Sequence, residues 1–315
     1  MFRKPAIISL KGYKLDKFET LLLKQHKPWG IILFKRNINN FKQLKKLTYD
    51  IRKCVNDPFY PILVDEEGGI VSRFSNLLNT KEFSQNFFGK LFEKNKKNAK
   101  LIYEYYLNSI CSVLKSTGIN INTIPVLDLL QKNTHKIIRT RTYSKNTRTV
   151  FSMGKICMDV LKKNKIGSVS KHIPGHGCAE VDSHKKKPTV NFSFNKLYKN
   201  DFSLFKKISS PFVMTAHIKY TKIDPLNVAT HSEYIIKNLI RNKLKYTGLI
   251  ISDDISMSAL SDDIVFNAKK ALKSGCNLIL YCRGNLKESK SVLRGLNKMD
   301  KFTEKKTHQF YQFLR

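Results

Sequence analysis

Residues that could transfer protons are concentrated in one stretch of the chain. Segment 171–177 reads Lys-His-Ile-Pro-Gly-His-Gly, and Asp182, Ser183 and His184 follow it. Its glycines allow the backbone conformations of a loop that moves over a pocket. Asp182 and His184 are two residues apart, so in an extended or turn conformation the carboxylate could orient the imidazole. An imidazole supported in this way is a candidate general acid and base, because it titrates near neutral pH.

A metal site is an alternative use of the same residues. His172 and His176 have i, i+4 spacing, and Asp182 and His184 could complete a tetrahedral set of ligands. A proline and a glycine lie between the first two histidines, however, and break the helix that this spacing needs. We therefore predict no metal here. A glycine-rich turn with incidental histidines is a further alternative, although three histidines and one aspartate are dense within the thirteen residues 172–184.

A second segment places two carboxylates directly after a short apolar run. Segment 248–257 reads Gly-Leu-Ile-Ile-Ser-Asp-Asp-Ile-Ser-Met. The apolar run predicts a buried strand that ends at Asp253, and Asp254 or Ser252 could cap the helix that follows. Taken alone, paired aspartates after a strand are equally well explained as a helix cap.

A third segment combines acidic residues, glycines and an arginine. Segment 64–74 reads Val-Asp-Glu-Glu-Gly-Gly-Ile-Val-Ser-Arg-Phe, an acidic strand end followed by a Gly-Gly turn and Arg73. At the floor of a cleft, Asp65 could accept two hydroxyl groups of a sugar. A salt bridge within a loop would explain the same residues.

The elements that must position these residues are short apolar runs rich in β-branched side chains. Eight such runs occur, at residues 6–10, 29–34, 61–65, 122–128, 166–172, 212–218, 248–253 and 276–282. Continuous apolar runs are typical of parallel strands buried on both faces. Between them the apolar residues follow helical spacing, as at 21–23, 102–113 and 235–240. Eight alternations predict an α/β fold, a single-domain (β/α)8 barrel of the TIM type, with a doubly wound open sheet as the alternative.

The ends of the predicted strands are polar. Five of the eight finish in polar side chains, at residues 65–67, 128, 171–172, 217 and 252–254. In a barrel the carboxyl ends of all strands meet at one mouth, where active sites lie. The sequence therefore predicts a functional site at this mouth.

Length and composition exclude several classes of protein. The chain has 315 residues, of which 41% are hydrophobic, so it can bury a large core and is not disordered. No apolar run approaches roughly 18 residues, so we expect no membrane span. The six cysteines are scattered without framework spacing, and the N-terminus lacks the features of a signal peptide. We therefore expect reduced thiols and a cytoplasmic location.

The charge of the chain is strongly positive. Lys and Arg number 58 against 24 Asp and Glu, a formal net charge of +34. Such a balance could indicate binding to nucleic acid. Only 11 of the 58 are Arg, however, and the 47 Lys are spread along the whole chain. Specific nucleic-acid readers favour Arg, so we predict a solvated basic surface and no nucleic-acid partner.

Together the three segments resemble the bacterial single-domain β-N-acetylglucosaminidases of glycoside hydrolase family 3. The family's K-H-[FI]-P-G-H-G-x4-D-[ST]-H signature matches residues 171–184, its S-D-D-[LI]-S-M strand matches 252–257, and its D-x-E-G-G-x-V-x-R-F stretch matches 65–74. The similarity covers about residues 5–285, and we expect residues 286–315 to form a helical C-terminal segment of the same domain, 1–315.

The resemblance implies a role for each matching residue. Asp253 would be the nucleophile that forms a covalent glycosyl-enzyme, as in retaining glycosidases. His184 would protonate the leaving oxygen and then activate water, and Asp182 would hold and polarise it. The remaining matches would bind the sugar, with Asp65 accepting hydroxyl groups and four basic residues lining the N-acetylglucosamine subsite: Arg73, Arg141, Lys171 and His172.

The resemblance also implies the substrate. We expect an exo-acting enzyme that removes terminal β-linked N-acetylglucosamine from peptidoglycan fragments (muropeptides), as a monomer and without metal or organic cofactor. A neutral imidazole shuttle would not repel phosphate, so a β-N-acetylglucosaminide phosphorylase stays open, as does a family 3 glycosidase of other specificity. The non-enzyme alternatives are a sugar-binding barrel and a basic nucleic-acid-binding protein. The chain differs from the family at two positions. Where it has Glu66 the family usually has Gln or His, and where it has Ile70 the family commonly has Arg. The loss of that arginine is expected to alter how the loop that follows Asp65 is braced.

Overall fold

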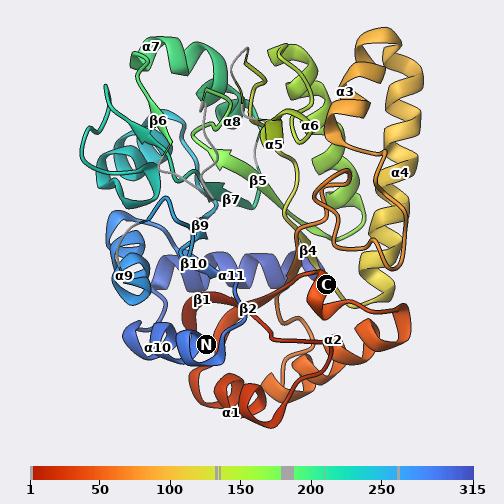
Figure 1. Ribbon diagram of the computed structural model, residues 1–315, viewed down its shortest axis with the longest axis vertical. Helices are drawn as coiled ribbons and strands as arrows, with labels where there is room; N and C mark the ends of the chain where they lie inside the picture. Colours follow the sequence, from red (N-terminus) through yellow and green to blue (C-terminus); the bar gives the residue numbers. More distant parts are fainter. Residues whose placement is uncertain (1–2, 132–133, 135, 179–187, 209, 261–262) are drawn as a thin grey trace.

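Eight parallel strands close into a barrel with helices around the outside (Figure 1). The structure is a computed structural model that describes residues 3–315 except 132–133, 135, 179–187, 209 and 261–262. The barrel strands, in their order around the ring, are β1 (Lys4–Ser9), β2 (Pro28–Leu33), β3 (Ile62–Val64), β4 (Ile121–Asn122), β5 (Gly167–Ile173), β7 (Phe212–Thr215), β9 (Leu249–Asp254) and β10 (Leu278–Tyr281). All eight predicted strands are present, so the barrel is confirmed and the open-sheet alternative is wrong. The short strands β6 (Thr189–Val190) and β8 (Lys219–Tyr220) form a separate two-stranded sheet.

One strand is much shorter than the sequence suggested. The apolar run 122–128 predicts a full strand, but β4 ends at Asn122. Pro125 has no N–H to donate to a ladder, and regular pairing stops before it. The segment still runs beside β5, because the N–H of Leu127 donates to the carbonyl of Lys171 at 2.7 Å. Asp128 is therefore carried to the same end of the barrel as the end of β5.

The helices lie outside the strands and begin where the sequence has a capping residue. Their bounds are α1 (Lys17–His26), α2 (Phe41–Val55), α3 (Gln85–Lys94), α4 (Lys96–Ser116), α5 (Lys136–Arg139), α6 (Thr147–Lys163), α7 (Phe194–Leu197), α8 (Ser203–Lys207), α9 (Ile264–Ser274), α10 (Leu286–Gly295) and α11 (Lys301–Leu314). Side chains of Asp, Asn or Ser accept hydrogen bonds from the first turn of nine of them, at Asp16, Asn40, Ser84, Asn95, Asn146, Ser193, Asp263, Asn285 and Asp300. The helix predicted before the seventh strand is a π-helix, Tyr234–Lys243. None of the described helices is long and apolar enough to cross a membrane.

The C-terminal segment closes one end of the barrel. Alternate strand residues such as Ile7 and Ile32 form an inner cluster, which also includes Phe310 of α11. The ring centroid of Phe310 lies 5.0 Å from that of Phe212, at the start of β7, and Thr307 accepts a hydrogen bond from the indole of Trp29 at 2.9 Å. Helix α11 therefore covers the amino ends of the strands, and it follows α10 in the C-terminal part of the chain. The opposite mouth, at the carboxyl ends, is left for a site.

Candidate active site

A cavity of about 200 Å³ lies at the carboxyl-end mouth of the barrel. It is lined by all six predicted site residues that the structure describes: Asp65, Arg73, Arg141, Lys171, His172 and Asp253. These residues come from the ends of β3, β5 and β9 and from the loops between strands. The two remaining predicted residues, Asp182 and His184, lie outside the described residues, so their roles stay predictions.

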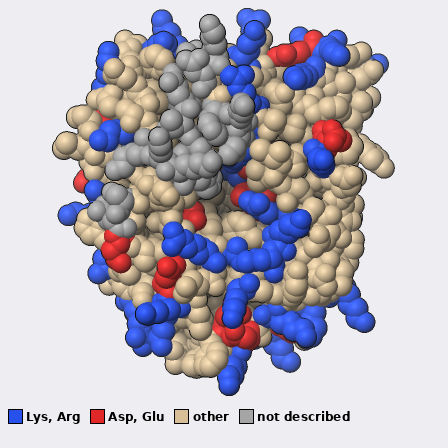
Figure 2. All heavy atoms as spheres, viewed as in Figure 1, with Lys and Arg blue, Asp and Glu red and all other residues tan. Residues whose placement is uncertain are grey.

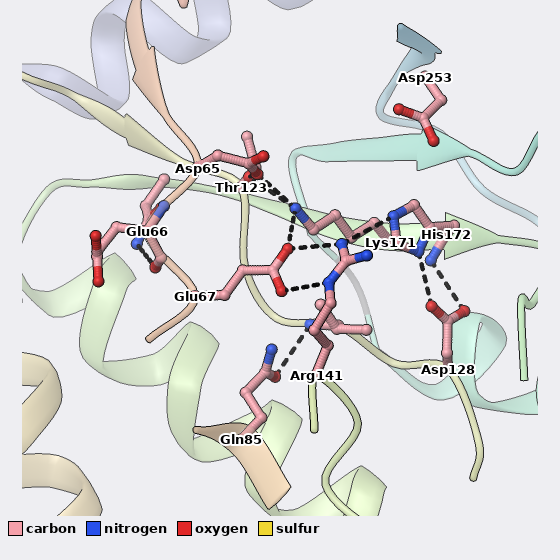
Figure 3. Close-up of polar contacts among 12 residues, drawn as sticks. Asp65, Glu66, Glu67, Gln85, Thr123, Asp128, Arg141, Lys171, His172 and Asp253 are labelled. Atoms are coloured by element: carbon pink, nitrogen blue, oxygen red, sulfur yellow. Dashed lines mark hydrogen bonds and ion pairs between the residues drawn. The ribbon is translucent and has the colours of Figure 1, made fainter. Parts of the chain in front are cut away.

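Lys171 is the centre of a buried cluster of charges (Figure 3). Its ammonium lies 2.6 Å from Asp65 Oδ1 and 2.6 Å from Glu67 Oε1, and donates to Thr123 at 3.0 Å. Burial favours the neutral amine, but the two carboxylates outweigh it and raise the pKa of Lys171. The ammonium is therefore charged at neutral pH and fixed in place from three directions.

Asp65 is held ionised at the floor of the cavity. Burial alone would raise its pKa, but Lys171 and Arg73 hold the pKa of Asp65 well below its usual range. Arg73 donates to the second carboxylate oxygen at 3.1 Å. The guanidinium of Arg73 also lies over the ring of Phe34, 5.2 Å from its centroid, on the cavity wall. Asp65 therefore offers a charged acceptor that suits sugar hydroxyl groups.

Arg141 and Glu67 form a bidentate ion pair beside Lys171 (Figure 3). The Nε and Nη2 atoms of Arg141 each lie 2.8 Å from a carboxylate oxygen of Glu67. Burial would favour the neutral acid, but Arg141 and Lys171 lower the pKa of Glu67. The sequence indicated an acidic strand end here, and the family stretch that matches residues 65–74 fixes a glutamate at position 67. Glu67 was nevertheless not predicted as a site residue, because its partner Arg141 is 74 residues away.

Asp128 orients His172. Its Oδ2 lies 2.7 Å from Nδ1 of His172, while Oδ1 accepts the backbone N–H groups of His172 and His176. Burial would raise the pKa of Asp128, but the two histidines and these hydrogen bonds lower it to about 2. Nε2 of His172 faces Nη2 of Arg141 at 3.5 Å, so Nδ1 carries the proton that Asp128 accepts. Asp128 was predicted as a polar strand end but not as a site residue, because its partners are 44 or more residues away.

Asp253 stands at the end of β9, and its carboxylate points toward Lys171 and His172 in Figure 3. The prediction that Asp254 or Ser252 caps the following helix is wrong. Asp263 caps α9, while Asp254 accepts the N–H and hydroxyl of Ser256. Turn residues separate β9 from α9, so these side chains stabilise the end of the strand instead.

Glu66 braces the loop that carries Arg73. One of its oxygens accepts the N–H groups of Arg73 and Phe74 at 2.7 and 3.0 Å and the hydroxyl of Ser72 at 3.1 Å. The other oxygen accepts the hydroxyl of Thr80 at 3.1 Å. The side chain points away from the charge cluster in Figure 3, and burial raises its pKa. Glu66, where the chain differs from the family, therefore accepts four hydrogen bonds that brace this loop. Ile70, the other position that differs, is 60% exposed.

The described residues show no group of three or more His, Cys, Asp or Glu that could hold a metal ion. Two members of the alternative metal set, Asp182 and His184, lie outside those residues. Lys and Arg side chains are spread over much of the face in Figure 2, with Asp and Glu between them.

Comparison with known proteins identifies the family. Residues 7–310 match the family model described as the glycosyl hydrolase family 3 N-terminal domain. A protein of Psychromonas ingrahamii named β-hexosaminidase is 33% identical, over 89% of this chain and 82% of its own length. Another β-hexosaminidase, from Bordetella pertussis, is 30% identical over 90% of this chain and 81% of its length.

Solved structures agree with this assignment. Native NagZ from Neisseria gonorrhoeae superposes with a TM-score of 0.89 and 28% identity, covering 100% of this chain and 90% of its own. A family 3 β-N-acetylglucosaminidase from Paenibacillus, of which this chain spans 61%, has a TM-score of 0.88 at 24% identity and supports the fold alone. With the family model, the curated relatives and the barrel in agreement, the chain belongs to glycoside hydrolase family 3.

Proposed function

We propose that the protein is an exo-acting, retaining β-N-acetylglucosaminidase that removes terminal N-acetylglucosamine from peptidoglycan fragments in the cytoplasm. The observation that carries the proposal is that Asp253 shares one cavity with the buried charges around Lys171. The names of the curated relatives support a hexosaminidase, and NagZ from Neisseria gonorrhoeae, 27% identical, has been solved in complex with N-trifluoroacetyl-D-glucosamine.

The charge cluster is suited to holding a neutral sugar. Asp65 accepts hydrogen bonds, while Arg73, Arg141 and Lys171 donate them, and each is held by an ion-pair partner. A sugar hydroxyl both donates and accepts, so alternating fixed donors and acceptors match its pattern. Because the ion pairs already exist, binding needs little reorganisation of charge.

The barrel offers a glycan no passage through the protein. Side chains such as Leu63 and Ile251 fill the barrel below the cavity, and α11 covers its far end. A sugar can therefore reach Asp253 only from the carboxyl-end mouth. The exo specificity in this proposal rests on the resemblance to the single-domain β-N-acetylglucosaminidases.

In the proposed reaction Asp253 attacks the anomeric carbon and displaces the leaving oxygen, which His184 protonates. The covalent glycosyl-enzyme is then hydrolysed by water that His184 deprotonates, with Asp182 orienting the imidazole throughout. Two displacements at one carbon retain its configuration. Phosphate in place of water would convert the second step into phosphorolysis.

The test is turnover of p-nitrophenyl N-acetyl-β-glucosaminide by the wild type and by Asp253→Ala. We expect a loss of about three orders of magnitude or more in Asp253→Ala, with an unchanged far-UV circular dichroism spectrum. Asp159→Ala, which removes an exposed carboxylate on α6, is the control and should be fully active. Wild-type turnover by Asp253→Ala would overturn the proposal.

Two further assays define the reaction. The p-nitrophenyl glucoside should be a poor substrate; equal turnover would indicate a glycosidase of other specificity. Added phosphate should leave N-acetylglucosamine as the product; formation of the sugar 1-phosphate would establish the phosphorylase alternative.

A further inference from the structure

Where the backbone pairing of β7 with β9 ends, side chains form hydrogen bonds with the backbone of β9. The backbone register of these two strands runs as far as Ile251. Two residues later, the N–H of Asp253 donates to Oγ1 of Thr215 at 3.3 Å. The carbonyl of Asp254 lies 3.0 Å from Nε2 of His217. The end of β9 is therefore held at both a donor and an acceptor by side chains of one neighbouring segment.

Thr230 joins these two contacts. Its Oγ1 lies 2.7 Å from Oγ1 of Thr215 and 2.7 Å from Nδ1 of His217. It belongs to the 3₁₀ turn Ala229–His231, whose first N–H donates to the carbonyl of Ile218 at 2.8 Å. The side chains of Thr215, Thr230 and His217 are all inaccessible to solvent. Hydrogen bonds in such surroundings are strengthened and strongly constrained in direction.

The direction of each hydrogen bond among Thr215, Thr230 and His217 can be worked out from the groups that His217 and Thr215 contact on β9. Nε2 of His217 faces a carbonyl, so it must carry a proton. Burial lowers the pKa of His217, so the ring is neutral at pH 7 and Nδ1 is an acceptor. The hydroxyl of Thr230 must then donate to Nδ1, and that of Thr215 to Thr230. Oγ1 of Thr215 is left to accept the N–H of Asp253.

One competing acceptor is the carbonyl of Ala216, 3.2 Å from Oγ1 of Thr230. Thr230 has a single hydroxyl proton, and donating it to Ala216 would leave Nδ1 of His217 buried without a donor. The bond to Nδ1 is also shorter, 2.7 Å. A buried acceptor without a donor is unfavourable, so donation from Thr230 to His217 is preferred.

The position of the backbone at residues 253–254 also determines the position of the Asp253 carboxylate. Oδ1 of Asp253 accepts the N–H of Asp254 at 2.8 Å. The carboxylate is thus tied to the same short stretch that Thr215 and His217 hold from its two sides. A shift of this stretch would shift the carboxylate relative to the sugar in the cavity.

We propose that Thr215, Thr230 and His217 form a directional hydrogen-bond chain that clamps residues 253–254 and sets the angle of attack of Asp253. The three are positioning residues, since they act through the backbone of β9 and not on the substrate. The inference rests on the proposed function, in which Asp253 is the nucleophile.

The experiment compares Thr230→Val with Thr230→Ser. Thr230→Val keeps the volume of the side chain but removes the hydroxyl, and with it the hydrogen bonds to Thr215 and His217. Thr230→Ser keeps the hydroxyl. We expect Thr230→Val to lower kcat for p-nitrophenyl N-acetyl-β-glucosaminide by about tenfold to a hundredfold, because small misplacements of reacting groups have effects of this size. KM should stay within about threefold of wild type, since the sugar-binding residues are untouched. Thr230→Ser should retain kcat within about threefold.

A second pair of variants keeps the test decisive if Thr230→Val does not fold. His217→Asn retains an acceptor toward Thr230 but loses the donor to Asp254, and Thr215→Val loses the contact with Asp253. Each should lower kcat more than it raises KM. Far-UV circular dichroism and the midpoint of urea unfolding identify variants that remain folded.

The outcomes separate this inference from the function on which it rests. Activity in Asp253→Ala overturns the proposed function. An inactive Asp253→Ala together with wild-type kcat in folded Thr230→Val and Thr215→Val overturns the clamp alone. An equal loss in Thr230→Ser and Thr230→Val also contradicts it, because serine preserves the hydroxyl.

Discussion

The carboxylate of Asp128 holds the ring and the backbone of His172 at the same time. Oδ2 lies 2.7 Å from Nδ1 of the ring, and Oδ1 accepts the N–H of the same residue at 3.1 Å. Oδ1 also accepts the N–H of His176 at 2.7 Å. One buried carboxylate therefore sets both the ring orientation of His172 and the path of the chain that leads into segment 174–178.

Replacing Asp128 should reduce the loss of stability that the protein undergoes as the pH falls. The pKa of Asp128 falls from 3.8 to about 2 on folding, so its ionised form is favoured in the native state. This contribution is present above pH 4 and is lost as the pH falls toward 2; the shift corresponds to about 2 kcal/mol. We expect Asp128→Asn to be less stable at pH 7 by at least this amount and to approach the wild type below pH 4, measured by urea unfolding between pH 3 and pH 7. A constant difference over this range would contradict the prediction, and exposed Asp159→Asn is the control.

Asp201 should destabilise the protein as the pH rises, whereas the contribution of Asp128 is lost as the pH falls. It is fully buried, and accepts the N–H of Leu129 at 3.3 Å and the thiol of Cys178 at 3.4 Å. Burial, with a smaller contribution from Asp128, raises the pKa of Asp201 to about 7. Because the folded pKa is raised, stability is fully present below about pH 4 and falls as the pH rises through 7, by about 4 kcal/mol at most.

We therefore expect Asp201→Asn to flatten the loss of stability between pH 5 and pH 8. The amide cannot ionise, so the variant should be more stable than the wild type at pH 8. Urea unfolding midpoints across this range measure the effect. Parallel curves for the two proteins would show that Asp201 is already ionised in the folded state across this range, so that its pKa is not raised.

Glu66 should control the binding of substrate through Arg73. In Glu66→Leu the N–H groups of Arg73 and Phe74 lose their acceptor, which should cost about 3 kcal/mol of stability and raise KM. Glu66→Gln keeps one oxygen for these groups and should stay close to wild type. Steady-state kinetics and urea unfolding of both variants provide the measurement. An unchanged KM in Glu66→Leu would mean that Arg73 does not depend on this brace.

His184 should matter most for poor leaving groups. If it protonates the leaving oxygen, His184→Ala should slow natural disaccharide fragments by several orders of magnitude and activated aryl glycosides far less. The reason is that p-nitrophenolate leaves without protonation. Rates on both substrate types give the answer, and equal losses would argue against the shuttle role.

Removal of metal ions should leave activity unchanged. The proposed reaction uses a carboxylate and an imidazole, and no step needs a Lewis acid. Turnover of the aryl glycoside is compared before and after dialysis against EDTA. Strong inhibition that zinc reverses would instead support the alternative set of His172, His176, Asp182 and His184.

The eight strands and the location of the chemistry could be predicted from the sequence alone, whereas a closed barrel and an open sheet remained alternatives. The apolar runs have a length and composition typical of strands buried on both faces, and their polar ends indicated the mouth. Asp65, Lys171, His172 and Asp253 could be predicted because each stands at or just beyond the end of such a run. The family assignment followed from the same segments.

Which of these residues act together depends on contacts that form only in the folded barrel. Glu66 and Glu67 are adjacent and chemically identical, yet one braces a loop and the other pairs with Arg141, 74 residues away. The role that sequence spacing suggested for Asp254 was wrong for a similar reason, since its partners are Ser256 in the turn after β9 and Cys282 just beyond the end of β10. Local spacing reports the elements, but a contact between distant elements exists only once the barrel closes and brings their ends to one mouth.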